Sequence, residues 1–224
     1  MKTTFIVILT FAFIGCKNKK DINIASDEIA KIQACKCYNN LDEEPIKTYT
    51  FSDQNSISVC GYIENDDFSE FAIFDCKTQK LIANYDAVQT CKLNFENDQL
   101  HIAEITKLPA NDNWEWNDLQ IAEEIITIKN GNVISLGSKP KTINISISEK
   151  AQLDFLNLLE TENYRKLDIE EILARLEVLS ISGNKRAKKK LYSIENDENY
   201  ELDGAIAEQY KSAIASIEWR EKNK

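Results

Sequence analysis

The sequence has few of the residues on which most catalytic and cofactor sites depend. Its 224 residues include one histidine, His101, and only six glycines. Neither Gly-x-Gly-x-x-Gly nor Gly-x-x-x-x-Gly-Lys occurs, so no backbone cradle for a nucleotide phosphate is predicted. Zinc sites need several Cys or His ligands at short spacings, and the chain has no Cys-x-x-Cys pair. The sequence therefore predicts no cofactor, no metal site and no catalytic residue.

Two features leave a hydrolase open as the alternative. His101 lies in a strand-like run, Leu100–Leu108, and any Ser-His-Asp or Cys-His site would have to use it, although no Gly-x-Ser-x-Gly accompanies it. The adjacent acids Glu123 and Glu124 could serve glycoside hydrolysis. Neighbouring strand residues point to opposite faces, however, so this pair is not a ready acid–base dyad.

The chain also has few bases for its size, and its acids are unevenly spread. The formal net charge is −10, and residues 21–150 carry 22 acids against 11 bases. Such a body repels nucleic acid, which we exclude as a partner. It would attract a basic protein, or it would simply improve solubility.

The N-terminal segment holds the one long apolar run. A short basic start is followed by a ten-residue, largely apolar run, Phe5 to Ile14, then Gly15, Cys16 and an abruptly polar stretch. Ten helical residues span about 15 Å, roughly half a hydrocarbon core, so this run is too short for a stable transmembrane anchor. The layout is that of a secretory signal, which predicts export.

The segment Phe13-Ile14-Gly15-Cys16 resembles the lipobox of bacterial lipoproteins. The resemblance covers residues 1–16 only and implies cleavage before Cys16, whose sulfur would then carry a diacylglycerol. Two or more acyl chains hold a protein durably on a membrane. The non-acidic Lys17 implies, by the same resemblance, transfer to the periplasmic face of the outer membrane. We therefore expect a signal peptide over 1–15, a tether over 16–26 and a membrane as partner through the lipid.

Five cysteines follow Cys16, all in the first half of the chain. An exported compartment favours disulfides, and an odd number leaves at least one thiol unpaired within the chain. The sequence does not choose among the possible pairings, although a bond between neighbours 35 and 37 would be strained. The candidates are Cys35, Cys37, Cys60, Cys76 and Cys91.

Residues 27–147 are predicted to form a mostly antiparallel β domain with a short leading helix. Apolar residues alternate with polar ones around 57–63, 91–95 and 143–147, as in a sheet with one buried face. Asn130-Gly131 between two apolar runs predicts a β-hairpin with a type I′ turn. The short strands favour an antiparallel meander that closes as a sandwich, a barrel or one curved sheet.

Residues 148–224 change to a helical period and are predicted to hold about four helices, which makes the fold class α+β. Asp168 and Glu171 have the spacing of a capping pair before the second helix, and Gly183 is a plausible stop. Asp203 is expected to help start the last helix.

Two surface clusters are candidates for binding. Trp114 and Trp116 flank Glu115 and could form an exposed aromatic patch on one strand face, with packing at the core edge as the alternative. A basic run could contact anionic headgroups or form a solvated helix face. That run comprises Lys185, Arg186, Lys188, Lys189 and Lys190.

These observations favour a non-enzymatic envelope protein that binds a basic protein or an envelope polymer. One form of it is an inhibitor or immunity-like protein that neutralises a basic exported enzyme. The alternative is a hydrolase of an envelope polymer. A deep pocket around His101 with a nucleophile or carboxylate in reach would favour the enzyme, and an exposed tryptophan on an acidic face would favour the binder.

Overall fold

The computed structural model describes residues 35–37, 44–64, 66–86, 90–161 and 167–223. The chain divides into two compact units, Met1–Ile32 and Gln33–Lys224, and every described residue belongs to the second unit. The expected signal peptide, Cys16, the tether and the leading helix up to residue 34 therefore lie outside the described residues.

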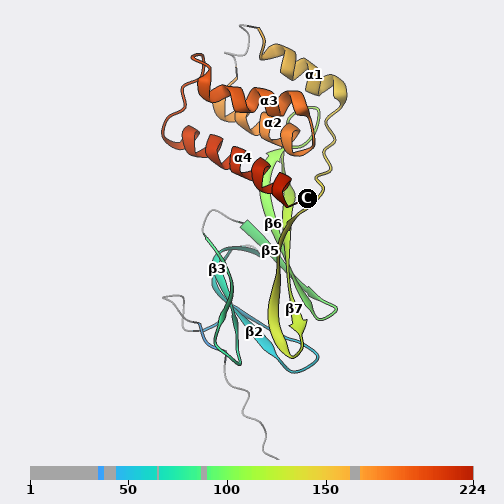
Figure 1. The fold of residues 1–224 in the computed structure, drawn as a ribbon, viewed down its shortest axis with the longest axis vertical. Helices are drawn as coiled ribbons and strands as arrows, with labels where there is room; N and C mark the ends of the chain where they lie inside the picture. Colours follow the sequence, from blue (N-terminus) through green and yellow to red (C-terminus); the bar gives the residue numbers. More distant parts are fainter. Residues whose placement is uncertain (1–34, 38–43, 65, 87–89, 162–166, 224) are drawn as a thin grey trace, which may run out of the picture. The chain divides into compact units, whose positions relative to one another are not determined.

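The second unit confirms the predicted α+β class, with an antiparallel sheet followed by helices (Figure 1). The sheet runs in the order β1-β2-β3-β5-β6-β7-β8, and β4 pairs with β3 beside that path. Of the three predicted forms, a sandwich, a barrel or one curved sheet, the structure has the curved sheet, and this sheet is open. The strands are β1 (Lys47–Thr50), β2 (Ser56–Glu64), β3 (Asp67–Asp75), β4 (Leu81–Tyr85), β5 (Thr90–Glu96), β6 (Gln99–Pro109), β7 (Trp116–Lys129) and β8 (Asn132–Pro140).

The sheet curves over one apolar core. Tyr49 of β1 stacks on Phe95 of β5 with ring centroids 5.2 Å apart, although these strands are not neighbours in the sheet. Phe71 of β3 stacks on Tyr85 of β4 at 4.5 Å. Aromatic pairs at these distances add specific attraction to the burial of their large surfaces. The alternating apolar residues of the strands thus meet inside the curve.

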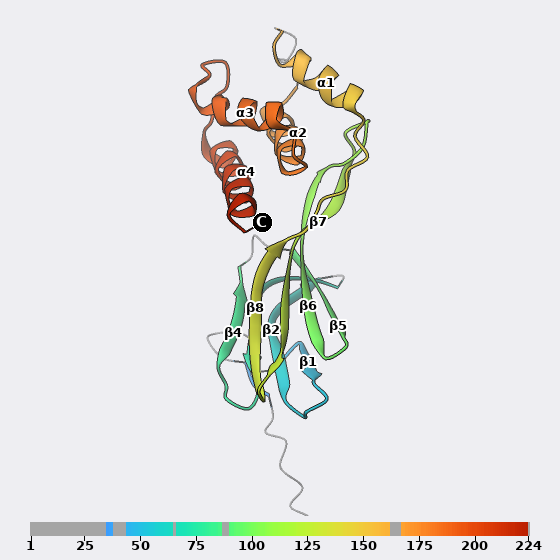
Figure 2. The same cartoon turned by 45° about the vertical axis from the view of Figure 1, so that its right-hand side comes forward.

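Strands β7 and β8 form the hairpin that the sequence predicts. Asn130 and Gly131 have φ angles of 54° and 72°, the left-handed values that a type I′ turn requires. Strands β6 and β7 are the longest of the eight, and they run past the rest of the sheet as a two-stranded arm toward α1 (Glu149–Leu158; Figure 2).

The prediction of a strand around residues 143–147 is wrong. This stretch forms only an isolated parallel bridge between Ser146 and Asn111. Ile145 and Ile147 pack instead against the helical core. The alternation of apolar and polar residues here belongs to an extended connector whose one side is buried under the helices. Such a connector has the same sequence pattern as a strand.

The helical segment has the predicted number of α-helices. Its core is built mainly from α2, whose Leu173, Leu176 and Leu179 have no exposed surface. None of the helices in the described part of the chain combines the length and the hydropathy that crossing a membrane requires. The remaining helices are α2 (Ile169–Ile181), α3 (Lys185–Ser193), the 3-10 turn η2 (Ile194–Asn196) and α4 (Gly204–Lys222).

The capping pair before α2 is not made as expected. Asp168 occupies the N-cap position, but its side chain makes no capping hydrogen bond within the described residues. Glu171 forms an ion pair with Arg175 one turn later instead. Gly183, with φ of +103°, follows the last residues of α2 as predicted.

Two disulfides fasten the first described residues to the sheet. Cys35 bonds to Cys76, directly after β3, and Cys37 bonds to Cys60 in β2. Cys35 and Cys37 are thus not bonded to each other, in line with the strain expected of such a bond, and each reaches a cysteine distant in the sequence. Cys91 in β5 remains a free, fully buried thiol.

Candidate functional site

The turn between β6 and β7 is the most tightly organised part of the surface. Asn111 Oδ1 accepts hydrogen bonds from the backbone N–H groups of Asn113, at 3.0 Å, and Glu115, at 3.1 Å. Its amide Nδ2 donates to Glu115 Oε2 at 2.7 Å. The N–H of Trp114 donates to the Asn111 carbonyl at 2.9 Å, and that of Ala110 to the Glu115 carbonyl at 3.0 Å. Bonds within so few residues fix the conformation of the turn.

Trp114 fastens this turn to the helices. Its φ is +59°, a costly value for a non-glycine residue that the surrounding bonds hold in place. The indole is half-buried and lies 5.0 Å from the ring of Phe155 in α1. The guanidinium of Arg175 in α2 stacks on the same indole. Trp114 therefore takes the core-edge role that the sequence left open.

Trp116 is instead exposed, which is the alternative that the sequence left open. It is the first residue of β7, and 53% of its surface is exposed. The two indoles do not form one patch, because Trp114 lies in the turn before the strand. Three exposed acids lie within four residues of Trp116 in the sequence. One of them, Asp118, pairs with Lys107 of β6 in the register of the sheet. We call this set the Trp116 surface; it consists of Trp116, Asp112, Glu115 and Asp118.

Asp112 links the Trp116 surface to the start of α1. Its Oδ1 accepts a hydrogen bond of 2.5 Å from the N–H of Ser148, the N-cap residue of that helix. The turn is thus held from both sides, by Trp114 on α1 and α2 and by Asp112 on the connector. The sequence analysis did not single out Asn111 or Asp112. The run Pro-Ala-Asn-Asp-Asn carried the signal, because Asn and Asp favour such turns.

His101 has a carboxylate in reach but lines none of the cavities described below. Its Nδ1 is 3.3 Å from Glu123 Oε1, and Glu123 Oε2 is 2.6 Å from Lys141 Nζ. Burial acts to raise the pKa of Glu123, but the hydrogen bonds from Lys141 and His101 outweigh it and hold that pKa below its usual range. Such a carboxylate stays ionised and is suited to an ion pair rather than to general acid catalysis.

Glu124 points to the opposite face, as predicted for adjacent strand residues. Tyr85 Oη donates to Glu124 Oε2 at 2.5 Å, and the Ser135 hydroxyl bonds to its other oxygen. Burial, followed by this hydrogen bond, raises the pKa of Tyr85.

Burial, with the charges of Glu104 and Glu124, also raises the pKa of Cys91 to about 12, so the thiol is not activated as a nucleophile. No group of three or more His, Cys, Asp or Glu in the described residues is arranged to hold a metal ion.

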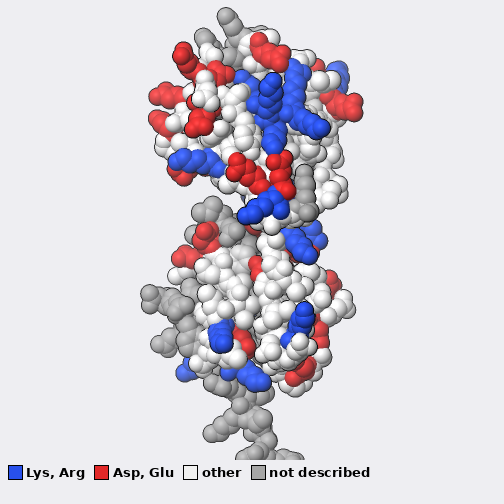
Figure 3. Space-filling model, in the orientation of Figure 1, with Lys and Arg blue, Asp and Glu red and all other residues white. Residues whose placement is uncertain are grey.

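The basic run lies on α3, and Figure 3 shows Lys and Arg gathered over the helical part. Three of its five charges form ion pairs with acids of the same segment. These are Arg186 with Glu160 at 2.7 Å, Lys188 with Glu221 at 2.6 Å and Lys190 with Asp197 at 2.9 Å. These ion pairs favour a solvated helix face over a contact with anionic headgroups. Lys185 and Lys189 form no ion pair within the described residues and are the two that could still make such a contact.

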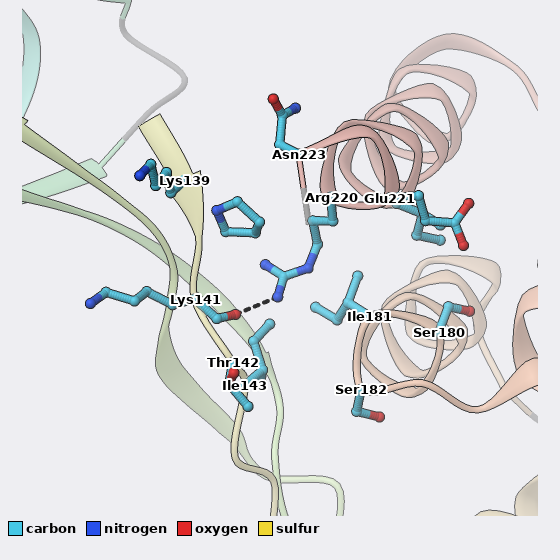
Figure 4. A pocket seen from close by; sticks show the side chains of 12 residues that line it. Lys139, Lys141, Thr142, Ile143, Ser180, Ile181, Ser182, Arg220, Glu221 and Asn223 are labelled. Carbon is cyan, nitrogen blue, oxygen red and sulfur yellow. Dashed lines mark hydrogen bonds between the residues drawn. The ribbon is translucent and has the colours of Figure 1, made fainter. Parts of the chain in front are cut away.

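A cavity of about 450 Å³ separates the β8 end from α2 and α4 (Figure 4). Arg220 points into it and is 7% exposed. Its guanidinium donates to the carbonyl of Ile121 at 2.7 Å and to that of Lys141. Arg220 therefore ties α4 to the sheet, and the carbonyl dipoles compensate its buried charge.

Comparison of the chain with protein families, curated proteins and solved structures finds no match. We therefore infer the function from the geometry of the sites described above.

Proposed function

We propose that this protein is a non-enzymatic binding module of the bacterial envelope that recognises a basic partner protein through the Trp116 surface. The observation that carries the proposal is the exposed indole of Trp116 at the start of β7, directly after a turn whose conformation is fixed. A half-exposed tryptophan has no role in the core of this fold, and tryptophan is among the residues that dominate binding energy at protein interfaces.

The rigidity of the turn supports a role in binding. Ordering a flexible loop on association lowers affinity, and a turn that is already ordered avoids that cost. The bonds of Asn111 and the packing of Trp114 on Phe155 provide that order before any partner arrives. The Trp116 surface is thus suited to bind without rearrangement.

The charge of the surface supports a basic partner. Asp112, Glu115 and Asp118 are exposed and lie within four residues of Trp116 in the sequence. Acids at the rim of an interface speed association with a basic protein and repel acidic ones. An inhibitor or immunity-like protein that neutralises a basic exported enzyme is the form of this function that fits best.

The location is proposed from two features. Cys16 in its lipobox setting would carry the lipid, and the tether that follows would place the β domain outside the membrane. The two disulfides support an oxidising compartment, because such bonds persist outside the cytoplasm. We propose attachment to the periplasmic face of the outer membrane.

Affinity capture from the native envelope tests the proposal. The wild type is compared with Trp116→Ala and with Leu136→Ala, a control whose residue is 49% exposed on β8. We expect a basic protein that is retained by the wild type and by Leu136→Ala and is lost from Trp116→Ala. Equal recovery on all three baits would contradict the role of Trp116.

The hydrolase alternative has one observation in its favour, the contact of His101 with Glu123. The described residues place no serine or cysteine in contact with His101, so this pair lacks the nucleophile of a Ser-His or Cys-His site.

A further inference from the structure

A second cleft, away from the Trp116 surface, lies between the sheet and helices α2 and α4. Its volume is about 590 Å³, and its wall includes residues of β6, β7, β8, α2 and α4. Three carboxylates line it: Glu177 from α2, Glu104 from β6 and Asp86 directly after β4. We call it the Glu177 cleft.

Glu177 is the unusual member of this set. It lies in a helix whose neighbouring positions 176, 178 and 179 are fully buried, and it is itself largely buried. The carboxylate accepts no hydrogen bond and forms no ion pair within the described residues, and burial alone accounts for its titration behaviour. A carboxylate that is partly removed from water and has no partner costs free energy, and a cation bound in the cleft would offset that cost.

We propose that the Glu177 cleft binds an organic cation, an ammonium or guanidinium group on an alkyl chain, with the charged group at Glu177. The indole of Trp219 lines the same cleft and offers a face on which such cations are attracted. Ile105 and Ile121 provide apolar surface for the alkyl chain. The hydroxyls of Ser212 and Ser216, on α4, lie along the wall and can accept hydrogen bonds from the cation.

A metal ion fits this cleft poorly. No three acids of the described residues are close enough together to share one ion. A carboxylate beside an indole face and apolar side chains suits an organic cation with an alkyl chain better than a bare metal ion. The chemistry is that of a lysine or arginine side chain of a partner protein, or of a free polyamine.

Binding of such a cation is coupled to loss of a proton. Burial raises the pKa of Glu177 to about 7, so near neutral pH half of the free protein holds Glu177 protonated. The other titratable groups that line the cleft are Glu104 from β6 and Asp86 after β4, whereas the residues of β7, β8 and α4 that line it carry no acidic or basic side chain. A cation lowers the pKa of Glu177 and releases its proton. Affinity therefore rises between about pH 6 and pH 8.

Calorimetric titration of the disulfide-bonded protein, residues 17–224, with 1,5-diaminopentane tests the proposal. We expect saturable binding at pH 8 that weakens at least tenfold at pH 5.5. At pH 7, titrations in buffers of different ionisation enthalpy should show release of about half a proton. Glu177→Gln should lose at least tenfold in affinity and release no proton. Glu170→Gln, which changes an exposed acid on the same helix, should behave as the wild type.

Two results would overturn the proposal. One is the absence of saturable binding at millimolar diamine, and the other is unchanged affinity in Glu177→Gln. Butyrate, the anionic counterpart, should not bind. Within a positive result, tighter binding of N-acetyl-lysine methylamide than of the diamine identifies a protein side chain as the natural source, and the reverse order identifies a polyamine. Trp116→Ala should leave these titrations unchanged, which separates this site from the proposed partner surface.

Discussion

The guanidinium carbon of Arg175 lies 4.6 Å from the centroid of the Trp114 ring, and this contact joins helix α2 to the turn that precedes Trp116. The same guanidinium is 5.4 Å from the ring of Phe155, so one cation serves two aromatic rings from different elements. An ion pair with Glu171 holds Arg175 in place. The turn that precedes Trp116 is therefore fixed to the helical core.

This relationship predicts different effects for two neighbouring tryptophans. Trp114→Ala removes a half-buried indole from Phe155 and Arg175, and we expect a loss of roughly 2–3 kcal/mol in the free energy of unfolding. Trp116→Ala removes an exposed side chain and should change that free energy by less than about 0.5 kcal/mol. Chemical denaturation measures both. Equal destabilisation by the two substitutions would show that Trp116 is also a packing residue.

Glu177 predicts a stability that falls as pH rises. Its pKa is about 7 in the folded chain against a usual value of 4.5, so the folded state binds the proton more tightly than the unfolded state. The free energy of unfolding is then highest below about pH 4.5 and decreases up to about pH 7, by roughly 3 kcal/mol from this group.

Glu177→Gln should remove this contribution. The variant should be more stable than the wild type at pH 8 by up to about 3 kcal/mol, and the two should be similar at pH 4. Urea denaturation across this range measures the difference, with Glu170→Gln as the control on the same helix. A wild-type advantage at pH 8 would mean that the carboxylate has a stabilising partner.

The disulfides predict the thiol count of the exported protein. Because the lipid would occupy the sulfur of Cys16, a single thiol, Cys91, should react, and only after unfolding, since it has no exposed surface. The bonded cysteines are separated by 41 and 23 residues, and closing loops of that length stabilises by roughly 3–4 kcal/mol each. Reduction should therefore lower the melting temperature, whereas Cys91→Ala should keep both bonds. Thiol labelling of the unreduced, unfolded protein that finds five reactive groups would contradict this framework.

The lipid anchor predicts the outcome of a single substitution at Cys16. Cys16→Ser should abolish metabolic labelling with fatty acid and release the protein from the membrane fraction, because the acyl chains supply the durable attachment. Replacing Lys17 with Arg keeps the charge beside the cysteine and should leave labelling intact. Fatty-acid labelling that persists in Cys16→Ser would remove the basis for the proposed location.

The sequence predicted the elements whose patterns are local. Asn130-Gly131 identified a hairpin because only a few residues accept the required φ angles. Asp203 occupies the N-cap position of α4, but its side chain makes no capping hydrogen bond within the described residues. The pattern misled at Ile143–Ile147, because a period of two describes any extended chain with one buried side. Pairing partners such as Cys37 and Cys60 depend on strand register across the sheet, which a single sequence does not determine.

The cleft was missed for a related reason. The sequence analysis did not single out Glu177, although Ala174, Val178 and Ser180 on its side of the helix are buried. A helix that is apolar nearly all round is surrounded by protein. The composition of α2 therefore carried a signal that a charge at position 177 would be buried, although its neighbours in space came only from the fold.

The most direct test of the central claim is site-specific photocrosslinking in living cells. A photoreactive amino acid replaces Trp116 in one strain and Leu136, the equally exposed residue on β8, in another. The account predicts that position 116 crosslinks to one basic exported protein, identified by mass spectrometry, and that position 136 does not. No crosslink from position 116, or the same products from both positions, would contradict it.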